Sequence, residues 1–388
     1  MNALKKTVSF FKYTHYRLFV FVGCFVPLLL VSIFAENIRL YYFPEGNFFR
    51  HFDGNLTMHV IDVGHGDAIA IRFPDNRVAL IDGGSHVYYR RVSNYLRTRV
   101  VGRNRQIDWL INTNPRAHHV GTLPQILESF NVVNVLRPPV RSLSSHDIDK
   151  EGLIDYVGTV PTEYTHFIDK AHSRATNVET FYAGMTFGAG TFRVVFHTPT
   201  PDYGLYAARG NLAEVSPVIT IQFGNQVFVL TGGAGWTTEN SFASTESARK
   251  IFDGVTLRTV HLKAGNHAHE RSNSALFLDL VQPTTVSVSA GTLDWYLSGY
   301  TLGRLRGRAG SNNVFITRDV GHIAIRTNGD DYRVFTGFQN PPNLWWLFAV
   351  LVVILAFLCF FNFERKKGQI ELETKSDCLN QSSLQSDE

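Results

Sequence analysis

The chain has 388 residues, a formal net charge of +4 and 44% hydrophobic residues. This composition is too apolar for a disordered chain, and its length suits one large globular domain or two small ones. With 30 Phe, 31 Gly and 14 Pro, it favours a fold of many strands and turns over a helical bundle. The three cysteines are Cys24, Cys359 and Cys378, so the middle of the chain contains neither a disulfide framework nor a thiolate metal site.

Two apolar stretches stand near the two ends of the chain. Residues 18–35 are apolar or small throughout, and residues 344–363 open on Trp345 and Trp346 and are followed by Arg365-Lys366-Lys367. Each is long enough to cross a hydrocarbon core about 30 Å thick. A cleaved signal peptide is the alternative for residues 18–35. The basic flanks of both stretches predict that both termini lie inside.

The predicted organisation follows from these two spans. It consists of a cytoplasmic N-terminus over 1–17, a transmembrane helix over 18–35, an extracytoplasmic domain over 37–342, a second transmembrane helix over 344–363 and a disordered cytoplasmic tail over 364–388. It predicts a protein of the cytoplasmic (inner) membrane, with both termini in the cytoplasm and the main domain in the periplasm or outside the cell.

The start of the predicted outer domain has the pattern of a β-meander. Residues 56–63, 68–73 and 78–81 are predicted strands, separated by polar turns at 64–67 and 74–77. Residues 107–111 are a further strand, which leads into a polar loop with two histidines and then a helix over 123–130. A strand that delivers a ligand-bearing loop to a helix is a common way to build an α/β site.

Several motifs resemble the metallo-β-lactamase domain of the ComEC-type DNA-uptake proteins. Residues 62–67 read DVGHGD where that family has DVGQGD, and residues 80–84 read LIDGG as in the family. The loop 113–121 keeps Thr113, Pro115, Ala117, His119 and Gly121 of the family's metal loop. Matching segments continue in order to about residue 335, except that 142–180 fits poorly and is predicted as an insertion. The resemblance implies a metallo-β-lactamase-like αββα sandwich, here flanked by two transmembrane helices.

The ligands of the implied two-metal site are mostly changed. By the resemblance, Asn114, Arg116, Gly233 and Asn266 stand where the family has metal ligands, His118 replaces an Asp, His119 and His267 are retained, and Asp82 supports the loop without binding metal. An arginine beside a would-be dication argues against a two-metal mechanism. The expected cofactor is none, with one zinc on His118, His119 and His267 as the alternative. His65 is predicted to be an ordinary turn residue.

The changed cleft is predicted to bind a ligand instead. Its predicted residues are Asn114, Arg116, His118, His119, Asn266, His267, His269 and Asp82. A run of basic residues is a second candidate surface for nucleic acid or another anion, and it comprises Arg90, Arg91, Arg97, Arg99, Arg103 and Arg105. Such a run also suits lipid headgroups, a protein partner or simply a solvated helix.

Two functions remain open from the sequence. The first is a membrane-anchored pseudoenzyme that acts as a binding or scaffold module for an anionic ligand, possibly nucleic acid, or for a membrane-protein partner. The second is a single-zinc hydrolase of the phosphodiesterase or nuclease type that uses His118, His119 and His267. Arg116 and Gly233 favour the first, because both replace ligands of the family's metal site.

Overall fold

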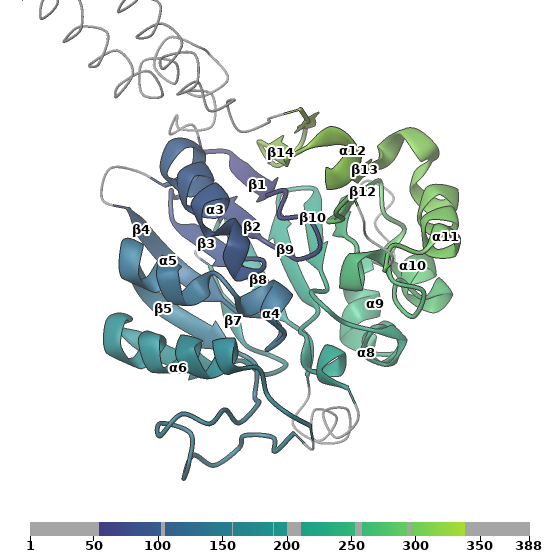
Figure 1. Cartoon of the computed structure of the whole chain (residues 1–388). Helices are drawn as coiled ribbons and strands as arrows, with labels where there is room; N and C mark the ends of the chain where they lie inside the picture. Colours follow the sequence, from purple (N-terminus) through teal and green to yellow (C-terminus); the bar gives the residue numbers. More distant parts are fainter. Residues whose placement is uncertain are drawn as a thin grey trace, which may run out of the picture. The chain divides into compact units, whose positions relative to one another are not determined.

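A computed structural model describes residues 54–101, 105–156, 158–188, 190–199, 211–252, 258–292 and 296–337. All of them belong to one compact unit within residues 43–340. Within the first unit, two β-sheets are stacked and helices lie against them (Figure 1).

The first sheet has eight strands in the order β15-β14-β1-β2-β3-β4-β5-β6. They are β1 (Leu56–Val60), β2 (Ile69–Arg72), β3 (Val78–Ile81), β4 (Gln106–Ile111), β5 (Asn131–Arg137), β6 (Asn177–Thr180), β14 (Ile323–Thr327) and β15 (Tyr332–Phe335). Pairing is antiparallel from β15 to β3 and parallel from β3 to β6. The carboxyl ends of β3 and β4 therefore lie at the same edge.

The second sheet has seven strands in the order β13-β12-β11-β10-β9-β8-β7. They are β7 (Thr186–Phe187), β8 (Phe192–Phe196), β9 (Ile219–Phe223), β10 (Gln226–Leu230), β11 (Thr259–Lys263), β12 (Thr285–Val288) and β13 (Val314–Ile316). Strands β10 to β13 are parallel, so the loops after β10 and β11 also leave from one edge.

The alternation of side chains along the strands divides the apolar residues between two cores. In β4, Trp109 and Ile111 join the core between the sheets, whereas Leu110 joins the core under the helices of the first sheet. In β10, Phe228 faces the other sheet, and its neighbours pack under the helices of the second sheet. Strands that bury both faces read as continuous apolar runs, as these do.

Helices cover the outer face of each sheet. On the first sheet they are η1 (His86–Tyr88), α3 (Tyr89–Tyr95), the π-helical turn η2 (Leu96–Val100), α4 (Ala117–Val120), α5 (Leu123–Ser129) and α6 (Thr162–Arg174). On the second they are α8 (Trp236–Ala243), α9 (Glu246–Phe252), α10 (Ala275–Val281) and α11 (Gly299–Ala309). Shorter elements are η3 (Leu212–Val215), η4 (Gly265–Ala268), η5 (Ser311–Asn313) and α12 (Thr317–Val320). This mixed α/β arrangement of two sheets fits the predicted metallo-β-lactamase-like αββα sandwich.

Residues 142–180, predicted as an insertion, contain two elements that pack into the fold. Helix α6 contributes buried Tyr164 and Phe167 to the core of the first sheet, and β6 pairs with β5 as its edge strand. The loop before α6 is anchored by a buried ion pair in which Arg137 Nη1 lies 2.7 Å from Asp147 Oδ1. The segment is therefore part of the fold, although its sequence departs from the family's.

The predicted localisation is contradicted. Across the described residues, the structure contains no helix whose length and apolar character would let it cross a membrane. The two-span assignment to the inner membrane, with flanking transmembrane helices and a periplasmic main domain, is withdrawn on this finding. The stretches 18–35 and 344–363 themselves lie outside the described residues.

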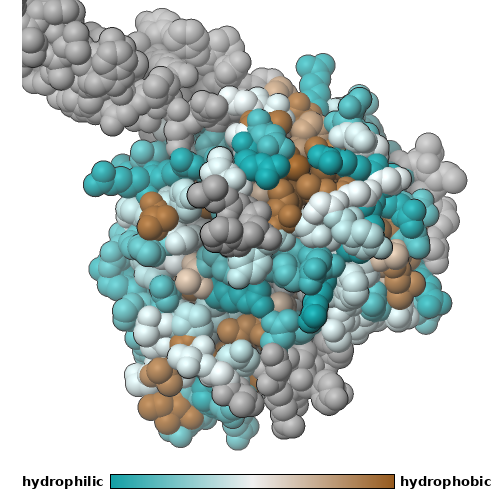
Figure 2. All heavy atoms as spheres, turned by 45° about the vertical axis from the view of Figure 1, so that its right-hand side comes forward, coloured by the Kyte–Doolittle hydropathy of each residue, from teal (hydrophilic) through white to brown (hydrophobic). Residues whose placement is uncertain are grey.

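The surface bears few large apolar side chains. On the face seen in Figure 2, hydrophilic and intermediate residues predominate, and hydrophobic ones gather in separate patches. The exposed large hydrophobic residues of the described part are Val87, Leu143, Ile148, Trp236, Leu276, Tyr296 and Tyr300. Two of them, Trp236 and Tyr296, line the cavity described next.

Candidate functional site

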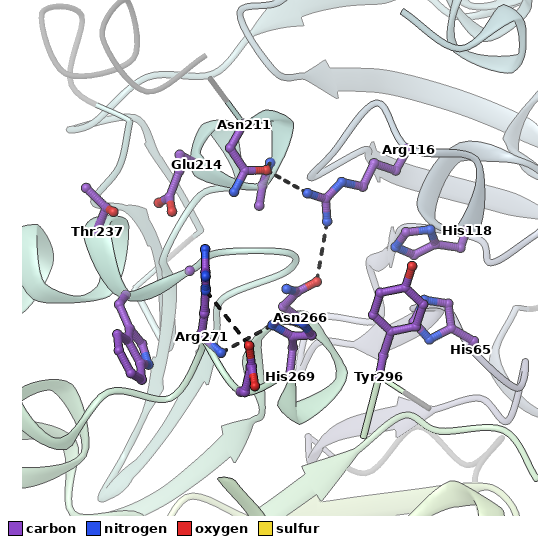
Figure 3. A pocket seen from close by; sticks show the side chains of 14 residues that line it. His65, Arg116, His118, Asn211, Glu214, Thr237, Asn266, His269, Arg271 and Tyr296 are labelled. Carbon is purple, nitrogen blue, oxygen red and sulfur yellow. Dashed lines mark hydrogen bonds and ion pairs between the residues drawn. The ribbon is translucent and has the colours of Figure 1, made fainter. Parts of the chain in front are cut away.

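The candidate site lies where loops from both sheets meet. The β3–η1 loop, the β4–α4 loop and the β1–β2 turn come from the first sheet, and η4 follows β11 of the second. Between them is a cavity of about 990 Å³. His65, His118 and Tyr296 gather at one side of it, and Arg116 extends between Asn211 and Asn266 (Figure 3).

Asp82 holds the β4–α4 loop in place through hydrogen bonds. Its buried carboxylate accepts hydrogen bonds from Thr113 N–H at 2.7 Å and from the Asn112 side-chain amide at 3.1 Å. His119 Nδ1 lies 2.8 Å from the same carboxylate. Because a carboxylate only accepts, Nδ1 carries the proton, and the lone pair of His119 is on Nε2. A carboxylate that fixes the imidazole tautomer in this way is the usual support of a histidine that binds metal.

Four imidazole rings form a cluster. Ring centroids are 4.7 Å apart for His65 and His118, 4.4 Å for His65 and His267, 4.6 Å for His118 and His119, and 5.2 Å for His118 and His267. Nε2 of His118, Nε2 of His119 and both ring nitrogens of His267 are buried without a hydrogen-bond partner. Burial holds the pKa of His118 and of His267 well below the usual value, so both rings are neutral. Orphaned buried nitrogens are rare, and a bound ion would satisfy them.

A buried ion pair lies under this cluster. Asp67 Oδ1 is 2.8 Å from Lys263 Nζ, and Lys263 also donates to the carbonyl of Ala264 at 3.0 Å. Burial by itself raises the pKa of Asp67, but the charge of Lys263, with smaller contributions from His267 and His119, outweighs it and lowers the pKa below its usual value. Asp67 is therefore a buried carboxylate that stays ionised.

The loop that carries His267 is held in a strained conformation. Asn266, His267 and Ala268 have φ of 44°, 57° and 58°, in the left-handed region that costs non-glycine residues free energy. The buried carboxylate of Glu239 fastens the end of this loop by accepting the N–H groups of Asn273 and Ser274, each at 2.7 Å. Burial raises the pKa of Glu239 to about 8.

Polar groups are bonded to one another at the positions where the resemblance implied other metal ligands. Asn114 Nδ2 donates to the carbonyl of Leu212 at 2.6 Å and to Ser216 Oγ at 3.0 Å, and Ser216 Oγ accepts the N–H of Gly233 at 3.1 Å. A Cβ on Gly233 would lie 3.2 Å from Asn114 Nδ2 and 3.4 Å from His119 Nε2. Position 233 thus faces the site without offering a ligand. We call Asn114, Ser216 and Gly233 the first position, and His118, His119 and His267 the second position.

Arg116 supplies a positive charge at the mouth of the cavity. Its guanidinium donates to the amide oxygens of Asn211 at 2.8 Å and Asn266 at 3.4 Å, and these partners are neutral. Burial lowers its pKa, but an arginine remains protonated at all physiological pH values. The charge of Arg116 is therefore available to an anion in the cavity.

The other predicted residues are more scattered. His269 lines the cavity, but its Nδ1 accepts the N–H of Arg271 at 3.2 Å, and it lies outside the imidazole cluster. In the basic run, Arg91 pairs with Asp62 at 3.1 Å, whereas Arg97 and Arg99 lie over the rings of Phe130 and Tyr95. Arg90 and Arg105 are exposed, and Arg103 lies outside the described residues. Three of these arginines therefore make contacts within the fold.

Four residues of the site were not assigned from the sequence: His65, Asp67, Lys263 and Tyr296. Two of them lie in the turn that reads GHGD, where flanking glycines with φ of 62° and 152° carry His65 into the cluster. Tyr296 stacks on His65 with ring centroids 4.8 Å apart. The motif that contains His65 and Asp67 was visible in the sequence, but the contact of a loop in the first sheet with Lys263 in the second was not.

Comparisons with known proteins give no family and weak structural likenesses. No family model and no curated protein match the sequence. Solved structures that match include CmlA, a diiron beta-hydroxylase from Streptomyces venezuelae, at 14% identity and a TM-score of 0.41, with 70% of this chain and 54% of that chain covered. The chain thus spans about half the length of CmlA. The metallo-beta-lactamase fold protein YhfI from Bacillus subtilis matches at 10% identity and a TM-score of 0.37, covering 70% and 100%. Zn(2+)-bound PqqB from Methylobacterium extorquens matches at 10% and 0.38, covering 68% and 97%. At such scores the description of the fold rests on the sheets and cores of this chain alone.

Proposed function

We propose that this chain binds one metal ion, zinc in the first instance, at its histidine cluster and hydrolyses an anionic ester in the adjoining cavity. The observation that carries the proposal is the set of orphaned imidazole nitrogens on His118, His119 and His267. The first position does not fit a metal, because its polar groups are bonded to one another and Gly233 has no side chain. The donor set therefore suits one ion rather than two.

The residues have separable roles in this proposal. The imidazoles hold the ion, and Asp82 keeps His119 in the tautomer that presents Nε2. A bound zinc lowers the pKa of a water molecule in its open coordination position to about 7. Arg116 binds the anionic part of the substrate, since a guanidinium pairs in bidentate fashion with phosphate or carboxylate. Tyr296 and Trp236 form part of the cavity wall and exclude water from the substrate.

A phosphodiester is the substrate class that this proposal favours. Arg116 suits a phosphate, and the sequence motifs resemble those of ComEC-type DNA-uptake proteins, whose ligand is a phosphodiester polymer. With purified full-length chain, we expect about one equivalent of zinc and slow hydrolysis of bis(4-nitrophenyl) phosphate that is lost in His267→Ala. His166→Ala, which removes an exposed histidine of α6, is the control. A protein with no bound zinc and no activity would refute the proposal.

A binding module without metal is the second candidate function. It is favoured by the closed first position and by the charge of Arg116, whose hydrogen-bond partners are neutral. Fluorescence-anisotropy titration of single- and double-stranded DNA with the full-length chain at low and high salt tests its nucleic-acid form. Binding should weaken steeply as salt is added, because the release of counterions from the nucleic acid then contributes less free energy. Binding should also weaken in Arg116→Ala. Changing Arg90 and Arg91 should flatten the salt dependence. Indifference to all three arginines would leave a protein partner as the better candidate.

A further inference from the structure

The histidine cluster contains two overlapping sets of possible metal ligands. The outer set is His65, His118 and His267, and the inner set is Asp67, His119 and His267. In each set the ligand atoms lie within 4.8 Å of one another. Since both sets use His267, one ion at a time is the natural occupancy. The question is which set holds it.

The inner set already contains a cation. Lys263 Nζ lies 2.8 Å from Asp67 Oδ1, which is the carboxylate oxygen nearest to His267, at 3.5 Å from its Nδ1. Both residues are fully buried, so their charges are poorly screened. A dication bound to Asp67 would meet the Lys263 ammonium at close range and without intervening water. The ion pair therefore opposes occupation of the inner set.

The same ion pair prepares His267 for the outer set. Asp67 faces Nδ1 of His267, although at 3.5 Å the contact is longer than a hydrogen bond. With Nδ1 directed at this carboxylate, Nε2 is the atom left for a metal. Lys263 holds the same carboxylate at 2.8 Å and thereby keeps Asp67 in a supporting role.

The backbone places His65 firmly in the outer set. The N–H of Asp67 donates to the carbonyl of His118 at 3.3 Å, which joins the β1–β2 turn to the β4–α4 loop. A Cβ on Gly66 would lie 2.5 Å from that carbonyl, so only glycine permits this approach. His65 and His118 also line the cavity, whereas His119 and Asp67 are fully buried. An ion in the outer set would therefore face the substrate.

We propose that the metal ion of the proposed function is held by His65, His118 and His267, and that Lys263 closes the inner set to it. His65 thus becomes a ligand in place of His119. This inference rests on the proposed function for the presence of a metal, but it makes an independent statement about which residues hold it.

Metal-free full-length chain titrated with Co²⁺ tests the inference through the visible absorption of the bound ion and isothermal calorimetry. We expect His65→Gln and His118→Ala to weaken Co²⁺ binding by at least about 100-fold, since loss of a supporting residue alone costs about 10- to 100-fold. His119→Ala should cost less than about 10-fold. His166→Ala is the matched control, and circular dichroism and thermal unfolding of each variant verify that it is folded.

Lys263→Met should change the metal affinity in a direction that a purely structural role of Lys263 would not produce. Removing the ammonium frees Asp67, so binding should tighten by at least about 10-fold as the dication takes the place of the lost charge. In this background His119→Ala should become the more damaging change and His65→Gln the less damaging one. Wild-type binding that depends on His119 and Asp67 but not on His65 would overturn the inference and leave the proposed function standing. A wild-type chain that binds no Co²⁺ would overturn both.

Discussion

The first and second positions of the cleft differ in how their polar groups are satisfied. At the first position, Asn114, Ser216 and Gly233 bond to one another, so that no described polar side chain there is left without a partner. At the second position, Nε2 of His118, Nε2 of His119 and both ring nitrogens of His267 remain buried and unbonded. The first position therefore has no polar group that needs an ion, whereas the second position does.

The two positions also differ in the free-energy cost of their buried polar atoms. Each buried polar atom without a partner costs about 1–3 kcal/mol, so the second position is expensive to maintain in the absence of a ligand. The first position carries no such cost. A bound ion offsets the cost at the second position, and this is the physical reason to expect one there and not at the first.

Among the tests of this difference between the two positions, His267→Ala should have the largest effect. His267 belongs to both possible ligand sets, so its removal should abolish metal binding at the second position. We expect the affinity for Zn²⁺ to fall by more than about 100-fold, which exceeds the usual loss for a supporting residue. Competition with a chromophoric chelator measures it. Unchanged affinity would mean that the orphaned nitrogens do not bind metal.

Asn114→Ala tests the first position in the same way. It removes the donor to Leu212 and Ser216 but no candidate metal ligand. We expect the free energy of unfolding to fall by about 2 kcal/mol, because buried acceptors lose their partner. Metal affinity should stay within about threefold of wild type, since Asn114 contributes no ligand atom to either set. Urea denaturation measures the free energy of unfolding, and the same chelator competition measures the metal affinity. A large loss of metal affinity would contradict the separation of the two positions.

Arg116→Ala should separate anion binding from metal binding. The guanidinium lines the cavity, and the side chains to which it donates hydrogen bonds are neutral. We expect inorganic phosphate to bind about tenfold more weakly, equivalent to about 1.4 kcal/mol, while zinc binding is unchanged or slightly tighter. Calorimetric titration of the zinc-loaded chain with phosphate measures the first quantity. Equal phosphate binding in both proteins would remove Arg116 from the proposed substrate site.

The smallest expected effect concerns the strained loop of the second position. Ala268 has φ of 58°, which an alanine adopts at a cost and a glycine does not. Ala268→Gly should raise the free energy of unfolding by about 0.5–1 kcal/mol, once the greater freedom of glycine in the unfolded chain is counted. Thermal unfolding at matched metal content checks it, and a decrease would show that the buried methyl group matters more than the backbone.

The sequence predicted most of the fold because its apolar runs and turns are local signals. The strands at 56–63, 68–73 and 78–81 appear as β1, β2 and β3, and the helix at 123–130 appears as α5. Residues 142–180 matched the family poorly, yet Tyr164 and Phe167 of α6 pack into the core of the first sheet. The predicted localisation was contradicted, because the described residues contain no helix that could cross a membrane.

The site was predictable only in part. The motif around His118 and His119 identified the loop, and the resemblance singled out His267 at the other half of the chain. His65 could not be chosen over an ordinary turn residue, because its role depends on the close approach of the β1–β2 turn to the carbonyl of His118. Lys263 was equally hidden, since a lysine in an apolar strand reveals its partner only when the two sheets are assembled.

The left-handed backbone of Asn266, His267 and Ala268 also restricts which residues this loop can accept. Asparagine visits this region more readily than most residues, because its short side chain can form local hydrogen bonds. A β-branched or bulky residue at position 266 would add strain, and Arg116 would lose the amide oxygen that it contacts at 3.4 Å. Position 266 therefore supports both the backbone beside His267 and the orientation of Arg116, so a single substitution there disturbs the two together.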